Sequence, residues 1–189
     1  MAPEYEKVGT AFANENDVIV AKINAEAETV VAGKYGIKGF PTLKFFPKGS
    51  TKEEEFDGKR DEAGIIEFLN EKSGTSRQSG GKLSDAFGTI KELNAIVAEY
   101  LTSKDKPSIA KKVKAKATDI NTKYSKYYSK VLDKLTKDAS FVNTEIKRIS
   151  RIVKGQLTPA KKDDFYIRLN ILNLFKDIKL DAKKVDDEL

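Results

Sequence analysis

The spacing of hydrophobic residues over the first 77 residues alternates between helical and strand patterns. Apolar side chains three or four positions apart, such as Tyr5, Val8 and Phe12, predict a helix, whereas short runs of β-branched or aromatic residues predict strands. The predicted order is helix, strand, helix, strand, strand and helix, which is typical of an α/β domain. These elements are predicted at residues 3–13, 18–21, 27–35, 42–46, 53–57 and 62 onward, with Asp61 as the cap of the last helix.

The remainder of the chain has a helical period throughout, and we predict five helices. Ser84 is the expected cap of the first, and Pro159 begins the fifth. The fifth is apolar nearly all round, so we expect it at the centre of a five-helix bundle. The five sets of apolar positions are Phe87, Ile90, Leu93, Val97 and Tyr100; Ile109, Val113, Ala117 and Ile120; Tyr124, Tyr128, Val131 and Leu135; Val142, Ile146, Ile149 and Val153; and Phe165, Ile167, Leu169, Ile171, Leu172, Leu174 and Phe175.

Charge separates the same two parts of the chain. Residues 1–78 hold 11 basic and 14 acidic residues, a net charge of −3, whereas residues 79–189 hold 24 and 15, a net charge of +9. The change falls in a Gly/Ser-rich stretch at residues 72–81 that is typical of a flexible linker. We therefore predict an α/β domain over 1–77, a linker over 78–83, a helical domain over 84–176 and a charged tail over 177–189.

The composition excludes several kinds of chemistry. The 189 residues contain no cysteine and no histidine, so they provide no disulfide, no thiol nucleophile and no imidazole for a catalytic triad or a metal site. We expect no metal and no cofactor. No window approaches 18 consecutive apolar residues, so no membrane span is predicted, and the N-terminus lacks the pattern of a signal peptide.

One run in the α/β part carries a resemblance. The segment from Tyr35 to Phe46, which contains Phe40 and Pro41, resembles the segment that carries the cis-proline in protein disulfide isomerases. Residues 2–8, 21–25, 56–60 and 70–77 resemble further segments of a thioredoxin domain in that family. The helical remainder is similar to the C-terminal D domain of the plant and fungal type, which follows two thioredoxin domains. The resemblance covers nearly the whole chain.

One departure from the family affects the expected activity. In the family a Cys-Gly-His-Cys motif lies just before the helix that resembles residues 2–8, and this sequence begins at that helix. The resemblance therefore implies an incomplete thioredoxin fold that lacks its first β-α-β segment, truncated just after the motif. Thiol–disulfide exchange requires a thiolate, so we expect no redox activity from these residues. The resemblance leaves three interpretations of this sequence: a truncated gene model, a splice product or a fragment.

Three positions match residues that support the active site in the family. Pro41 matches the cis-proline; the alternative is an ordinary trans proline in a turn. Arg60 matches an arginine that tunes the cysteine pKa, although a solvated arginine beside Asp61 is the better interpretation without the dithiol. Lys22 matches a buried lysine whose glutamate partner lies on the missing strand, so we expect it to be hydrated or paired elsewhere.

The C-terminus resembles the retrieval signal of the endoplasmic reticulum. Asp186, Asp187, Glu188 and Leu189 match three of the four positions of Lys/His-Asp-Glu-Leu, and Asp186 replaces the basic residue. A chance acidic tail is the alternative. With the family resemblance, the ending predicts that the parent protein resides in the lumen of the endoplasmic reticulum.

Two further clusters have simpler explanations. The lysines between Lys111 and Lys116 lie at helical spacing around Val113 and have no interleaved aromatic residue, so a solvated helix face is predicted and no nucleic-acid partner is expected. Tyr124, Tyr127 and Tyr128 are predicted to pack in the core and its rim rather than to form a peptide site.

The loss of a central strand predicts a weak α/β domain. In the thioredoxin sheet that strand lies between residues 18–23 and 42–46, and each unpaired buried backbone group costs about 1–3 kcal/mol, against about 5–15 kcal/mol for a whole domain. We expect residues 1–77 to be marginal alone or to accept a strand from a partner chain, whereas the helical part folds independently.

Two functional hypotheses follow. The first is a redox-inactive protein disulfide isomerase family member, involved in protein folding, that binds unfolded or folding client proteins or other partners. The second is a basic helical interaction module with an inert thioredoxin remnant. Whether the chain is an enzyme stays open at this point.

Overall fold

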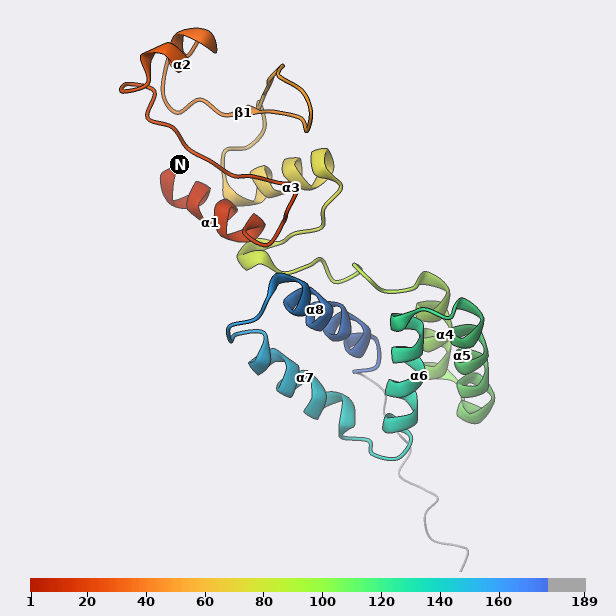
Figure 1. Ribbon diagram of the computed structural model, residues 1–189. Coiled ribbons are helices and arrows are strands. Elements are labelled where there is room, and N and C mark those ends of the chain that lie inside the picture. Colours follow the sequence, from red (N-terminus) through yellow and green to blue (C-terminus); the bar gives the residue numbers. More distant parts are fainter. Residues whose placement is uncertain (177–189) are drawn as a thin grey trace, which may run out of the picture. The chain divides into compact units, whose positions relative to one another are not determined.

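The computed structural model describes residues 1–176. Within it, the chain forms two compact units, Met1–Ser84 and Asp85 onward (Figure 1). Each unit has its own hydrophobic core, and each is described by itself.

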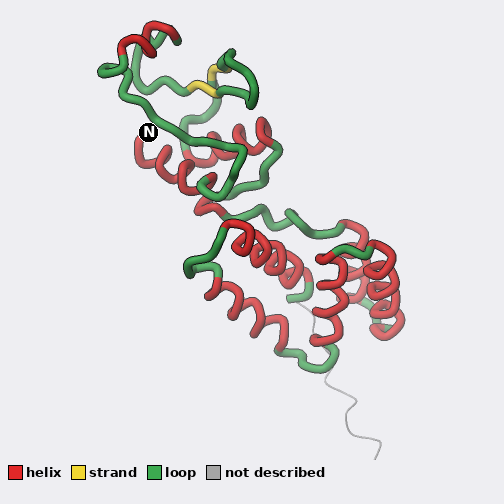
Figure 2. The backbone as a smooth tube through the Cα atoms, viewed as in Figure 1, coloured by secondary structure: helices red, strands yellow, loops and turns green. Residues whose placement is uncertain are grey.

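The first unit has three α-helices and a very small sheet. Its elements are α1 (Ala2–Phe12), α2 (Thr29–Lys34), β1 (Lys44–Phe45), β2 (Glu54–Glu55), α3 (Glu62–Ser73) and the short 3-10 helix η1 (Ser79–Gly81). The strands are antiparallel, with Lys44 opposite Glu55 and Phe45 opposite Glu54. Loops make up most of the chain between α1 and α3 (Figure 2). The predicted strands at 42–46 and 53–57 are thus present but only two residues long.

The core of the first unit lies between α1 and α3. Six apolar residues are buried there, namely Val8, Ala11, Phe12, Phe56, Ile65 and Ile66. The Phe68 ring makes edge contacts with Phe45 and Phe56, with centroids 5.4 and 5.1 Å apart, and so ties the sheet to α3. Asp61 caps α3 as predicted, because its Oδ1 accepts a hydrogen bond of 2.8 Å from the Gly64 backbone.

The predicted strand at 18–21 is wrong as secondary structure, since these residues belong to no strand. Their side chains nevertheless alternate as in a strand: Val18 and Val20 pack against the core, whereas Ile19 is 89% exposed. Among the described residues, the backbone N–H groups of residues 18–23 have no hydrogen-bond acceptor. The pattern for a strand is present, but no described strand lies beside it to complete a ladder.

The Gly/Ser-rich stretch also differs from the predicted flexible linker. It folds onto the first unit, where η1 packs against α1 and α3. Backbone hydrogen bonds join Gln78 to Lys82 and Ser84 to Ser76, each 2.8 Å long. Gly81 has a φ of +78°, and a Cβ there would lie 3.4 Å from backbone oxygens of α1, so glycine suits this close approach. Composition alone missed these local contacts.

Over residues 85–176 the second unit is a bundle of five helices, as predicted. They are α4 (Lys91–Thr102), α5 (Lys106–Ile120), α6 (Lys123–Leu135), α7 (Phe141–Ile152) and α8 (Pro159–Leu174). Side-chain caps begin two of them: Asp105 caps α5, and Thr122 with Ser125 forms a capping box on α6. Helix α8 contacts α4, α6 and α7, and Pro159 begins it as predicted.

The start of the bundle differs from the prediction. Helix α4 begins at Lys91, so Ser84 is not its cap and Phe87 lies in the preceding loop with 40% of its surface exposed. The Phe87 carbonyl oxygen accepts a hydrogen bond from the Asn170 side chain of α8. This tertiary contact holds the loop where the apolar spacing alone predicted another turn of helix.

Candidate functional site

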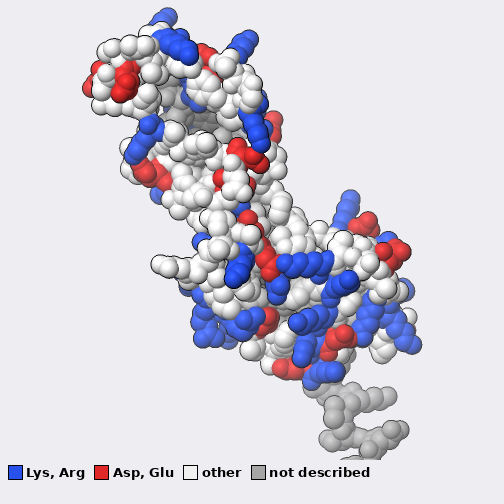
Figure 3. Space-filling view, viewed as in Figure 1, with Lys and Arg blue, Asp and Glu red and all other residues white. Residues whose placement is uncertain are grey.

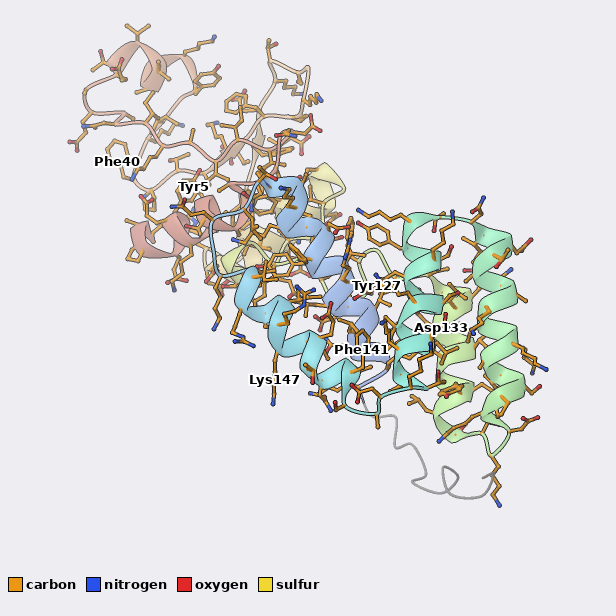
Figure 4. All side chains as sticks on the ribbon, turned by 60° about the horizontal axis from the view of Figure 1, so that its bottom comes forward. Tyr5, Phe40, Tyr127, Asp133, Phe141 and Lys147 are labelled. Carbon is orange, nitrogen blue, oxygen red and sulfur yellow. The ribbon has the colours of Figure 1, made fainter. Side chains whose placement is uncertain are left out.

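The loop that contains Pro41 forms one candidate site, in the first unit. The Phe40–Pro41 peptide bond is cis. Thr42 closes the loop by donating its hydroxyl to the Gly39 carbonyl oxygen at 2.7 Å. Phe40 is 64% exposed and is labelled in Figure 4. The loop thus presents an aromatic side chain and backbone groups to solvent.

The structure brings Arg60 and Pro41 together. Arg60 donates from Nη1 to the Pro41 carbonyl oxygen at 3.4 Å, although both residues are exposed. Arg60 precedes the cap of α3, so the start of that helix positions it beside the loop. Two of the three residues singled out in the sequence therefore share one surface.

Lys22 lies at the surface of the first unit and is paired with a carboxylate other than the one on the missing strand. Its ammonium contacts the carboxylate of Glu6 on α1, and 75% of its side chain is exposed. The hydrogen bond to Glu6 raises the pKa of Lys22. Because the lysine stays at the surface with a carboxylate beside it, it carries no cost of an unpaired buried charge.

Large apolar side chains are exposed on the first unit. Helix α1 holds the segment at residues 18–23 in place, because the Tyr5 hydroxyl donates to the Ala21 carbonyl oxygen at 2.7 Å. Such exposure over a unit of this size marks a candidate interaction surface. The exposed residues are Ile19 at 89%, Ile23 at 58%, Val30 at 84%, Phe40 at 64% and Phe46 at 45%.

Neither thiol nor metal chemistry is found at this surface. The whole sequence lacks cysteine. Over residues 1–176 no group of three or more acidic side chains is arranged to hold a metal ion. In the same part of the chain, no helix has the length and apolar character needed to cross a bilayer.

A second candidate site lies in the helical unit, between α6 and α8. A cavity of about 160 Å³ is lined there by Lys123, Tyr124, Lys126, Tyr127, Lys130 and Arg168. Figure 4 shows Tyr127 between these helices, and Figure 3 shows lysine and arginine side chains gathered over the unit. Sequence analysis missed this site because Arg168 is 38 or more residues away from the other lining residues.

Asp164 organises the cations beside this cavity. Its carboxylate contacts Lys123 at 2.5 Å, Arg168 at 2.9 Å and the Tyr124 hydroxyl at 3.2 Å. Burial favours its neutral form, but the contacts from Lys123 and Arg168 outweigh burial and lower the pKa of Asp164. The acid therefore stays ionised and holds Arg168 in place.

The three tyrosines of α6 have different roles. Tyr128 is fully buried, donates to Asn94 Oδ1 at 2.5 Å and accepts from the Ile90 backbone, so it is core as predicted. Tyr124 and Tyr127 are half-buried and line the cavity. Burial, together with Asp164 for Tyr124 and Glu145 for Tyr127, raises the pKa of each of these two to about 12.

Two predictions from the sequence remain, one for the lysines of α5 and one for the last four residues. The lysines from Lys111 to Lys116 form a solvated face, as predicted: Lys112 pairs with Glu99 and Lys114 with Asp133, while Val113 is buried. Asp186, Asp187, Glu188 and Leu189 lie outside the described residues.

Two family models match the chain. The thioredoxin model matches residues 1–71, and the model of the C-terminal domain of endoplasmic reticulum protein ERp29 matches residues 88–175. The matches agree with the two units and with the α/β and five-helix architecture inferred from the sequence.

Similarity to individual proteins extends this likeness over the whole chain. The chain is 40% identical to protein disulfide-isomerase erp38 of Neurospora crassa and 41% identical to protein disulfide-isomerase tigA of Aspergillus niger, over its full length in both cases. It is 36% identical over 93% of its length to a probable protein disulfide-isomerase A6 of Medicago sativa. It spans about half the length of these relatives, between 50% and 53%.

Proposed function

Because the chain belongs to the protein disulfide isomerase family, we propose that it serves protein folding as a redox-inactive member that binds client or partner proteins. The absence of any cysteine from its 189 residues supports the first part. Exchange proceeds by attack of a thiolate on a disulfide sulfur, and these residues supply no thiolate. An insulin-reduction assay is expected to give the uncatalysed rate, and turnover above that rate would contradict the proposal.

The segment at residues 18–23 carries the binding part of the proposal. It combines unpaired backbone N–H groups with exposed Ile19 and Ile23, and its inner face is already packed on the core through Val18 and Val20. An extended apolar segment of a client can pair with this unpaired segment through backbone hydrogen bonds that do not depend on sequence. The same surface suits a partner chain that supplies a strand.

The test uses a permanently unfolded client, such as lactalbumin with reduced and alkylated cysteines, and measures its binding to the full chain by fluorescence anisotropy. Replacing Ile19→Ser and Ile23→Ser together is expected to weaken binding about fivefold or more, because the apolar area available for contact falls. Since Ile19 and Ile23 are exposed, their replacement leaves the fold intact.

Val30→Ser is the matched control: Val30 belongs to the same set of exposed apolar residues and is 84% exposed, but it lies on α2, outside the segment with unpaired backbone N–H groups. The control is expected to bind like the parent chain. Equal losses in the control and the double variant, or no loss in the double variant, would show that the segment is not the binding surface.

We place the parent protein in the lumen of the endoplasmic reticulum. The likeness of residues 88–175 to a domain of an endoplasmic reticulum protein supports this location. The sequence of the last four residues, from Asp186 to Leu189, is in keeping with it. Removing these four residues from the parent protein is expected to increase its secretion.

A basic helical interaction module is the second candidate. The observation that favours it is the cavity between α6 and α8, where four of the six lining residues are lysine or arginine. The two candidates concern different units of the chain, and one protein can have both functions.

A further inference from the structure

Only some of the lysine and arginine side chains that line the cavity between α6 and α8 form ion pairs with acidic residues. Lys123 and Arg168 both contact Asp164. Over the described part of the chain, Lys126 and Lys130 take part in no ion pair, and both are exposed. Glu145 on α7 also interacts with Lys130 and Arg168, but its ion pair is with Arg148, so Lys126 and Lys130 remain without an ion-pair partner at this cavity.

Arg168 is oriented by its neighbours and keeps donors to spare. Its guanidinium lies over the rings of Tyr127 and Phe165, 5.3 and 5.8 Å from their centroids. Its Nη2 contacts Asp164 at 2.9 Å, whereas its Nε and Nη1 donate to no acceptor among the described residues. A guanidinium fixed in this way is suited to a second carboxylate, because the planar fork matches the two oxygens.

From this arrangement we propose that Lys126, Lys130 and Arg168 form a binding site for an acidic segment of a partner protein. Lys126 and Lys130 are one helical turn apart on α6, and Arg168 faces them from α8. Carboxylates along one peptide reach all three cations. This site deepens the partner-binding part of the proposed function by naming the chemical class of the partner.

The geometry favours an acidic peptide over a nucleic acid. Binding of single strands relies on aromatic rings that stack on bases. Here Lys123 lies over Tyr124 at 5.4 Å and Arg168 lies over Tyr127 at 5.3 Å, so cations occupy faces of both rings. A cavity of about 160 Å³ also suits a carboxylate side chain more than a stacked base.

The experiment measures the affinity of the full chain for a fluorescent peptide rich in glutamate and aspartate, by anisotropy at low salt. The parent chain is expected to bind, and added salt is expected to weaken binding. Lys126→Gln with Lys130→Gln is expected to weaken binding about threefold to tenfold. Arg168→Lys, which keeps the charge but loses the fork, is expected to weaken binding on the order of fivefold.

The matched control is Lys111→Gln with Lys147→Gln, which removes the same charge from exposed positions outside the cavity. It is expected to bind within about twofold of the parent, because neither side chain lines the cavity and exposed charges contribute little. Equal losses in control and test variants, no binding by the parent chain, or tighter binding of a polyuridylate RNA through the same residues would overturn the proposal. The client assay depends on Ile19 and Ile23 instead, so the two failures are distinguishable.

Discussion

At the scale of single residues, Tyr128 shows how a buried polar group is held by partners from distant parts of the sequence. Tyr128 is fully buried, yet its hydroxyl donates to Asn94 and accepts from the Ile90 backbone at 3.0 Å. Burial raises the pKa of Tyr128 to about 12, and only the hydrogen bond from Ile90 opposes this. The neutral hydroxyl is therefore the form that the fold requires.

This requirement predicts a loss of stability at high pH. The pKa of Tyr128 is higher in the folded state than its ordinary value of 10, so the unfolded state releases the proton first as pH rises. The raised pKa corresponds to a stabilisation of the folded state by about 2–3 kcal/mol. This stabilisation is complete below pH 10 and is lost between pH 10 and about 12. Urea unfolding at pH 9 and pH 11 measures about half of this loss, because pH 11 lies midway between the two pKa values.

Tyr128→Phe serves as the comparison for this titration. The variant is less stable at neutral pH by about 1–2 kcal/mol, since Asn94 and Ile90 lose their partner. Between pH 9 and pH 11 it is expected to lose less further stability than the parent chain. An identical loss in both chains would mean that other groups cause the alkaline transition.

At the scale of elements, the stretch at residues 74–84 shows how one side chain decides the path of a segment. Arg77 is 3% exposed and forms an ion pair from Nε to Glu15 at 2.6 Å. Its Nη1 also donates to the Gly81 carbonyl oxygen at 3.2 Å. The Asn70 side chain of α3 bonds both the N–H and the carbonyl oxygen of Arg77 at 2.8 Å. These contacts fix the segment to α1 and α3, although its composition is typical of a flexible linker.

Removing this side chain is expected to release the segment. Arg77→Ala should destabilise the first unit by about 2–4 kcal/mol, because Glu15 and the Gly81 carbonyl oxygen lose a buried charged partner. Hydrogen exchange of the amides in η1 and of Ser84 should accelerate in the same variant.

Arg60→Ala, at an exposed arginine, is the control and should change stability by less than about 0.5 kcal/mol. Equal exchange rates in Arg77→Ala and the parent would contradict the assigned role.

At the scale of the whole molecule, the two units differ in the size of their cores. Over residues 85–176 the helical unit buries eighteen apolar residues, ten of them on α4, α5 and α6. The first unit buries seven, six of them in its core cluster, and its sheet has two strands of two residues. Because burial of apolar area is the main stabilising term, stability should follow the same order.

Separate polypeptides test this difference. Residues 85–189 alone are expected to unfold in one cooperative thermal transition, at a midpoint close to that of the helical unit in the full chain. Residues 1–84 alone are expected to unfold at a lower temperature and with weaker cooperativity. Circular dichroism follows both. If residues 85–189 show no cooperative transition while the full chain does, the helical unit does not fold independently.

The sequence by itself determined the helices, the two-part architecture and the family. Helical periods, caps such as Asp61 and the run from Tyr35 to Phe46 are local signals, because each is set by residues close together in the sequence. Only the tertiary structure decided three other features. Residues 18–21 have the side-chain alternation of a strand but no partner, because pairing depends on a neighbour that local sequence does not encode. The Gly/Ser-rich stretch became ordered through Arg77, whose partner Glu15 is 62 residues away. Lys126, Lys130 and Arg168 line one cavity because the bundle packs α8 beside α6, and charge counts along the chain carry no information about that distance.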